Sequence, residues 1–61
     1  MVFVYTDELQ HTIRVILDEG EAIGNLVGPT LSFVPTDPDN SDFAAIVAAG
    51  EPIAPFTRYG Q

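Results

Sequence analysis

The segment FVPTDPDNSDF, residues 33–43, decides the fold of this chain. Two prolines, three aspartates, an asparagine and a serine lie between its two phenylalanines, so it cannot continue as one regular element. The residues before it, LSFVP at 31–35, place Leu31 and Phe33 on one face of a strand. Pro35 ends that strand, because proline cannot donate a hydrogen bond to a sheet ladder.

A helix begins after this strand, and the sequence offers two starting points for it. Asp37 can cap a helix whose first residue is Pro38, where the missing N–H of proline costs nothing. Alternatively, Asn40 and Ser41 supply the cap, and Asp42 then lies favourably at the positive end of the helix dipole. Both alternatives remain open at this stage.

The predicted helix spans about residues 38–49 and ends at Gly50, a residue that suits the C′ position. Phe43, Ile46 and Val47 recur at the spacing of one helix face, and four alanines add helix propensity. A helix of two to three turns is unstable alone in water. Its apolar stripe is therefore expected to pack on the strands or on another chain.

Two more strands are predicted upstream, at about residues 2–5 and 12–17, joined by a polar loop into a hairpin. Both stretches are rich in β-branched or aromatic residues, which favour strands. A helix within residues 7–18 is the competing interpretation, since apolar residues there also recur at helical spacing. Residues 18–30 contain three glycines and a proline and are expected to form a loop, with a brief strand at 22–23.

These elements predict an α+β fold in a single small domain, residues 1–61, with a three-stranded antiparallel sheet and one short helix. Residues 51–61 form an extended, proline-containing tail that lies on its own domain or docks on a neighbour. A chain of 61 residues buries only about 60% of its unfolded surface. Since the chain has no cysteine for disulfides, we expect a partner to support its stability.

The charge balance bears on the kind of partner. Nine acidic residues face two basic ones, Arg14 and Arg58, and the formal net charge is −7. Direct binding of nucleic acid is not expected, because it depends on lysine and arginine releasing counterions from phosphates. The sequence shows no signal peptide and no apolar run of about 20 residues, so we expect a soluble protein that does not insert into a membrane.

No motif indicates catalysis or metal binding. The spacing of Asp37, Asp39, Ser41 and Asp42 is similar to that of a calcium loop, but the glycine and the final glutamate of such a loop are missing. His11 follows Asp7 by four residues without a nucleophile motif beside it, which is typical of a solvated turn histidine. We therefore expect no cofactor, no metal and no enzymatic activity.

The run from Phe33 to Phe43, with the alanine-rich helix, Gly50 and the proline-containing tail, resembles a pattern in short bacteriophage proteins. There an I/F-P-x-D-P-x-N-x-D-Y/F segment follows a short hairpin, including in tail-fibre-assembly-like proteins. The resemblance covers about residues 31–56. It implies a non-enzymatic, phage-encoded accessory protein, a minor virion structural or assembly component that docks on capsid or tail proteins. Its expected location is the virion or the host cytoplasm.

Apolar side chains are the expected anchors for a partner, because buried aromatic residues dominate interface energies. These candidates are Phe33, Phe43, Ile46, Val47, Ile53, Phe56 and Tyr59. The alternative is a small acidic phage protein that inhibits a host protein, including by mimicry of nucleic acid. That alternative requires one face to carry Asp7, Glu8, Asp18, Glu19 and Glu21. A self-associating module is a further alternative.

Overall fold

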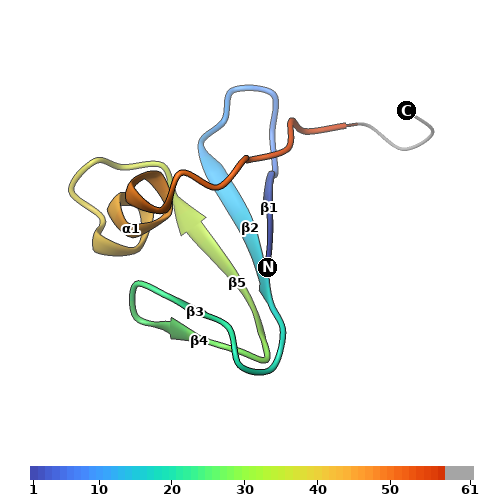
Figure 1. Cartoon of the computed structure of the whole chain (residues 1–61). Coiled ribbons are helices and arrows are strands. Elements are labelled where there is room, and N and C mark those ends of the chain that lie inside the picture. The colour runs from blue at the N-terminus through green and yellow to red at the C-terminus, as the bar shows by residue number, and fades with distance from the viewer. Residues whose placement is uncertain (58–61) are drawn as a thin grey trace.

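The computed structural model describes residues 1–57 and forms strands and one helix in the predicted α+β arrangement (Figure 1). The strands are β1 (Val2–Tyr5), β2 (Thr12–Leu17), β3 (Ala22–Ile23), β4 (Leu26–Val27) and β5 (Thr30–Pro35), and the helix α1 spans Ser41–Ala49. The predicted order of hairpin, third strand, helix and extended tail is confirmed.

The main sheet has three antiparallel strands in the order β1-β2-β5. Ile13, Val15 and Leu17 of β2 are buried, whereas Arg14 and Ile16 between them are exposed, so alternation gives the sheet an inner and an outer face. The competing helix within residues 7–18 is wrong. Residues 12–17 form β2 instead, and the β-branched residues of β2 pair with β1 on one side and β5 on the other, where their side chains pack well.

A second hairpin, β3–β4, occupies part of the stretch that the sequence predicted as a loop. The brief strand at 22–23 is confirmed as β3, but its partner β4 was not predicted. A two-residue turn, Gly24–Asn25, joins the two strands. The backbone N–H of Asn25 donates to Asp42 Oδ1 at 2.8 Å, which fastens the tip of this hairpin to the first turn of α1.

The start of α1 settles the choice between the two predicted caps. Asn40 is the N-cap, and its Oδ1 accepts hydrogen bonds from the backbone N–H groups of Asp42 (2.9 Å) and Phe43 (3.0 Å). Asp37 instead accepts from the N–H of Asp39 at 2.9 Å and shapes the turn before the helix. The alternative start at Pro38 is therefore wrong, and the helix begins three residues later, at Ser41.

The end of α1 matches the prediction. Gly50 adopts the left-handed conformation with φ of 70°, and its N–H donates to the carbonyl oxygen of Val47 at 3.1 Å. Glycine suits this position because a Cβ is disfavoured at positive φ.

Both α1 and the β3–β4 hairpin pack on the inner face of the main sheet, and Figure 1 shows them on the same side of β5. Ile46 of α1 and Ile23 of β3 complete a core whose other members come from the three long strands. The buried core residues are Phe3, Ile13, Val15, Leu17, Ile23, Val34 and Ile46. The helix is thus stabilised by its own sheet, the first of the two packing alternatives considered for its apolar stripe.

The tail lies along the free edge of β1. Ala54 forms a parallel bridge with Val4: its N–H donates to the carbonyl of Phe3 at 2.8 Å, and its carbonyl accepts from Tyr5 at 3.0 Å. Ile53 packs against the core. Up to residue 57, therefore, the tail lies on its own domain.

Candidate functional site

The outer face of the main sheet carries a continuous set of apolar side chains. The strand register places Ile16 between Val2 and Leu31 in one cross-strand row. It places Arg14 between Val4 and Phe33 in the next row. We call the following six residues the outer face: Val2, Val4, Arg14, Ile16, Leu31 and Phe33.

This outer face is unusually exposed for apolar side chains. Val2 is 49% exposed, Leu31 58% and Phe33 62%, whereas Phe3 and Val34, next to Val2 and Phe33 in the same strands, are buried. Neither α1 nor the β3–β4 hairpin covers it, because both pack on the inner face. Contiguous exposed apolar surface of this kind makes the outer face the candidate interaction site of the described domain.

A hollow lies at one end of the outer face, beside residues 56–57 of the tail. Its volume is about 280 Å³, and Phe33 and Phe56 form aromatic walls from β5 and from the tail. The lining residues are Val4, Tyr5, Thr6, Arg14, Phe33, Phe56 and Thr57. Its lining is mixed, with two phenylalanines and a valine beside hydroxyl groups and a guanidinium group, so it offers both apolar contact and hydrogen bonds to one side chain of a partner protein.

Arg14 adds one positive charge to this otherwise apolar surface. It is the only lysine or arginine among residues 1–57, and no carboxylate of that part of the chain forms an ion pair with it. It stands on the central strand with apolar neighbours on both sides. Its guanidinium group is therefore available to a carboxylate or a carbonyl from outside the described domain.

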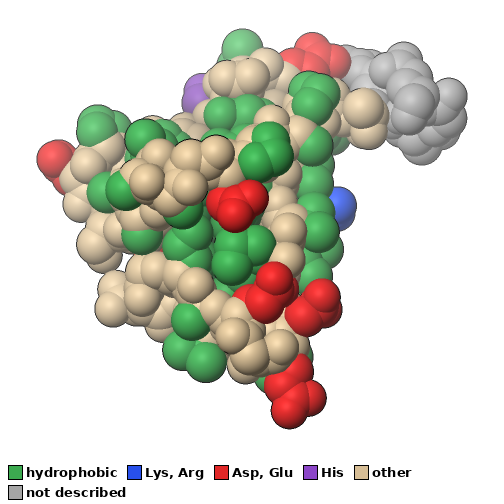
Figure 2. Space-filling model, in the orientation of Figure 1, with side chains coloured by type: hydrophobic (Ala, Val, Ile, Leu, Met, Phe, Trp, Pro, Cys, Tyr) green, Lys and Arg blue, Asp and Glu red, His purple; other side chains and the backbone are tan. Residues whose placement is uncertain are grey.

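The acidic residues named for the inhibitor alternative lie at the two ends of β2. Asp7 and Glu8 lie in the loop before β2, whereas Asp18, Glu19 and Glu21 follow its other end. A strand of six residues separates these two groups by roughly 20 Å. In Figure 2 the acidic side chains form separate groups on the visible surface. Among residues 1–57, the acidic side chains that the inhibitor alternative invokes thus form two separate groups and not one continuous patch.

Glu21 has a local structural role. Its carboxylate pairs with the amino group of Met1 at 2.5 Å, and it also accepts from the backbone N–H of Asp18 at 2.7 Å. The hydrogen bond from the amino group, followed by that from Asp18, lowers the pKa of Glu21. The same hydrogen bond raises the pKa of the Met1 amino group.

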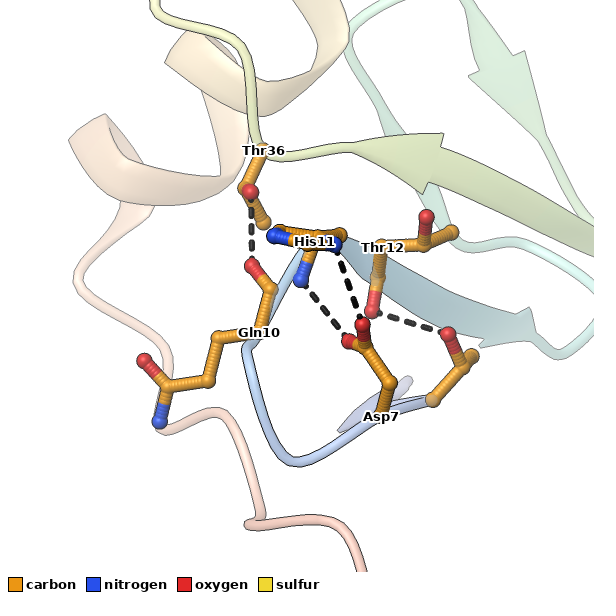
Figure 3. A network of polar contacts seen from close by, with 6 residues as sticks. Asp7, Gln10, His11, Thr12 and Thr36 are labelled. Atoms are coloured by element: carbon orange, nitrogen blue, oxygen red, sulfur yellow. Dashed lines mark hydrogen bonds and ion pairs between the residues drawn. The ribbon is translucent and has the colours of Figure 1, made fainter.

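The Asp7–His11 pair belongs to a loop-closing network, drawn in Figure 3. Asp7 accepts from the backbone N–H of His11 at 2.8 Å, and its other oxygen lies 3.3 Å from the imidazole Nδ1. The hydroxyl of Thr36, just past β5, donates to the carbonyl of Gln10 at 2.6 Å. These contacts hold the β1–β2 loop against the end of β5, as expected for a turn histidine.

The predicted anchors divide into accessible and inaccessible side chains. Phe33, Val47 and Phe56 are exposed and remain available to a partner. Ile46 is fully buried in the core and cannot serve as an anchor, because its apolar surface is already covered. Phe43 and Ile53 are partly buried against the same core, so they contribute mainly to folding. Tyr59 lies outside the described residues.

Several residues of the outer face were not predicted as anchors, namely Val2, Val4, Arg14, Ile16 and Leu31. The alternation in residues 12–17 already separates Arg14 and Ile16 from the buried set. It cannot show which alternate set faces the core, since both contain apolar residues. The missing signal was the register between the strands, which brings these positions into adjacent rows.

Residues 1–57 contain no group of three or more histidine, cysteine or acidic side chains that could hold a metal ion. Within the same residues, no helix has the length and apolarity needed to cross a membrane.

No protein-family model, curated protein or solved structure matches this chain. The resemblance of residues 31–56 to short bacteriophage proteins therefore stays a prediction. The site must be interpreted from its own geometry.

Proposed function

We propose that this chain is a non-enzymatic accessory protein that binds another protein through the outer face of its sheet. The observation that supports this proposal is the uncovered apolar surface around Leu31 and Phe33. A partner that covers this surface would remove apolar area from water, which is favourable by about 25 cal/mol per Å². Such burial is the main source of affinity in protein association. A domain this small also gains stability from any partner that binds only its folded form.

The same surface suggests what the partner offers. An apolar side chain would fill the hollow between Phe33 and Phe56, and a carboxylate or carbonyl beside it would meet Arg14. Aromatic and arginine residues in desolvated pockets carry much of the binding energy in interfaces. We therefore expect a partner surface that is mainly apolar and has one acceptor near its centre.

The setting we propose is that of a bacteriophage particle: a minor virion structural or assembly component that docks on a capsid or tail protein. This part of the proposal is supported by the resemblance of residues 31–56 to short phage proteins, together with the marginal size of the domain. Mass spectrometry of purified particles of the encoding phage tests it. Many copies per particle would support a capsid site, a few copies would support the tail, and complete absence would contradict a virion role.

The docking surface itself is tested with paired double variants. Leu31→Ser with Phe33→Ser removes the most exposed apolar groups of the outer face. The matched control is Leu9→Ser with Val27→Ser, because these side chains are 74% and 70% exposed but lie outside that face. We expect capture of the partner by the tagged chain to fall about a hundredfold for the first variant, as for the loss of interface hot spots, and to stay unchanged for the control.

Salt separates this proposal from the acidic-inhibitor alternative. Binding through the outer face should depend weakly on ionic strength, since most of its contacts are apolar. Capture that weakens steeply with added salt, and that survives the Leu31 and Phe33 substitutions, would contradict docking through this face.

A further inference from the structure

We propose that two copies of this chain pair through the free edges of their β5 strands and form one continuous six-stranded sheet. This pairing uses backbone groups at the edge of the sheet and leaves the outer face open. It therefore goes beyond the proposed docking function and stands or falls separately from it.

The outward direction of the β5 backbone follows from the hydrogen-bond ladder between β2 and β5. Thr36 N–H donates to the carbonyl of His11 at 2.9 Å, next to the pairing of Thr12 with Pro35. Hydrogen-bonded and non-hydrogen-bonded pairs alternate in an antiparallel ladder. Val34 and Ser32 thus bond to β2, and the N–H and C=O groups of Leu31 and Phe33 point away from it.

These outward groups have no partner within residues 1–57. No hydrogen bond joins the backbone of Leu31 or Phe33 to α1, to the β3–β4 hairpin or to the tail. The opposite edge of the sheet is different, because Ala54 bonds to Phe3 and Tyr5 there. The domain closes one edge with its own tail and leaves the other open, and an open edge is a template for another strand.

The open edge is complementary to itself. If two β5 strands lie antiparallel with Ser32 at the two-fold axis, Leu31 of each copy faces Phe33 of the other. Both residues then form hydrogen-bonded pairs, giving about four bonds between the copies. Leu31 and Phe33 also point to the same outer face, so each makes an apolar cross-strand contact with its counterpart.

The limits of this pairing are set by two prolines. Pro29 precedes β5 and Pro35 ends it, and neither can donate a hydrogen bond across the interface. In the symmetric register they lie opposite each other, so no donor is lost on either side. The window between them contains no charged residue, although the chain as a whole carries a net charge of −7. A second copy is thus matched in length, in donors and acceptors, and in charge.

Sedimentation equilibrium of the full chain tests the association. We expect a concentration-dependent dimer that becomes tighter as salt increases, because salt screens the repulsion between two acidic chains. A chain that stays monomeric at millimolar concentration in high salt would overturn the proposal.

Cysteine substitutions test the register, and the chain has no native cysteine to interfere. Ser32→Cys places one thiol on each side of the two-fold axis. The Cα atoms of the two cysteines would lie about 4.5 Å apart, which is within the range for a disulfide. The matched control is Thr30→Cys, on the same face of β5 and also partly buried. Its two copies would lie roughly 14 Å apart, too far to bridge.

Both variants are oxidised under identical conditions after circular dichroism shows that each retains the wild-type fold. We expect Ser32→Cys to form a covalent dimer at least about tenfold faster than Thr30→Cys, because pairing raises the effective thiol concentration. Equal rates for the two variants, or no dimer for Ser32→Cys, would overturn the proposed register. Binding of a different protein at the free edge of β5, without any dimer of this chain, would likewise contradict the proposal.

Discussion

The two faces of the main sheet are built from the same three strands but meet different surroundings. On the inner face, Ile13, Val15 and Val34 pack beneath α1 and the β3–β4 hairpin. On the outer face, Ile16, Leu31 and Phe33 are just as apolar but remain exposed. Apolar alternation in this chain therefore serves two purposes: one set of side chains folds the domain, and we propose that the other set binds.

The sharpest test of this division uses two isoleucines of the same strand. Ile13→Ala removes a fully buried side chain and should cost about 4 kcal/mol, enough to prevent cooperative folding of so small a domain. Ile16→Ala, on the outer face, should cost only about 1–2 kcal/mol, because its side chain is 36% exposed and less apolar surface is lost. Thermal melts followed by circular dichroism measure both. Similar losses for the two variants would break the distinction between the faces.

The second test concerns the hairpin that closes the inner face. A Cβ at Gly28 would lie only 2.0 Å from the backbone oxygen of Asp18, so Gly28→Ala should force the base of the hairpin apart and cost about 3 kcal/mol. Chemical denaturation gives the loss of unfolding free energy. Gly20→Ala is the control, since a Cβ there meets no atom within 4 Å and the expected cost, about 1 kcal/mol, arises only from its φ of 87°.

A third and smaller effect is expected at the start of the helix that covers the inner face. Asn40→Ala removes the acceptor for two backbone N–H groups and should cost about 1 kcal/mol. Asp37→Ala should cost less, because Asp37 serves only the turn before the helix. Denaturation midpoints of the two variants give the comparison. A larger loss of stability for Asp37→Ala than for Asn40→Ala would contradict Asn40 as the N-cap and favour Asp37.

The smallest expected effect lies at the exposed end of the sheet and depends on pH. The pKa of Glu21 is lowered from 4.5, so its contribution to stability is present above that value and is lost as the pH falls through the lowered pKa. The pKa of the Met1 amino group is raised from 8.0, so its contribution is present below that value and is lost as the pH rises. The pair therefore stabilises the fold most near neutral to slightly acid pH.

Melting temperatures of wild type and Glu21→Gln, recorded across this range, check the effect. The difference between them should peak at about pH 6 and disappear at both extremes. Glu19→Gln is the control in the neighbouring exposed position. Because the pair is accessible to water, the difference should also shrink with added salt.

Much of the fold could be predicted from the sequence, because its signals are local. The alternation in residues 12–17 and the proline at position 35 located two strands, and Gly50 located the end of the helix. The β4 strand was missed although Gly24–Asn25, between two short apolar pairs, is typical of a two-residue hairpin turn. The three glycines of residues 18–30 favoured a loop, and the two-residue apolar pairs were too short to indicate strands against them.

The candidate site could be predicted only in part, because it depends on contacts between distant segments. Phe33 and Phe56 were expected anchors, but only the strand register and the path of the tail bring them to one hollow. Ile46 fits the pattern of a binding stripe equally well, and only its packing on the sheet shows that it belongs to the core. Local periodicity identifies apolar faces without showing which of them the same chain will cover.

Site-specific photo-crosslinking tests the proposed docking face most directly. A photoreactive phenylalanine analogue is placed at Phe33 on the outer face and, separately, at Leu9 in the β1–β2 loop, the most exposed of the large apolar side chains in the described chain. In cells that produce the natural partner, we expect the probe at position 33 to cross-link one discrete protein and the probe at position 9 to cross-link none. Equal cross-linking from both positions, or cross-links from position 33 only to a second copy of this chain, would contradict docking of the outer face on another protein.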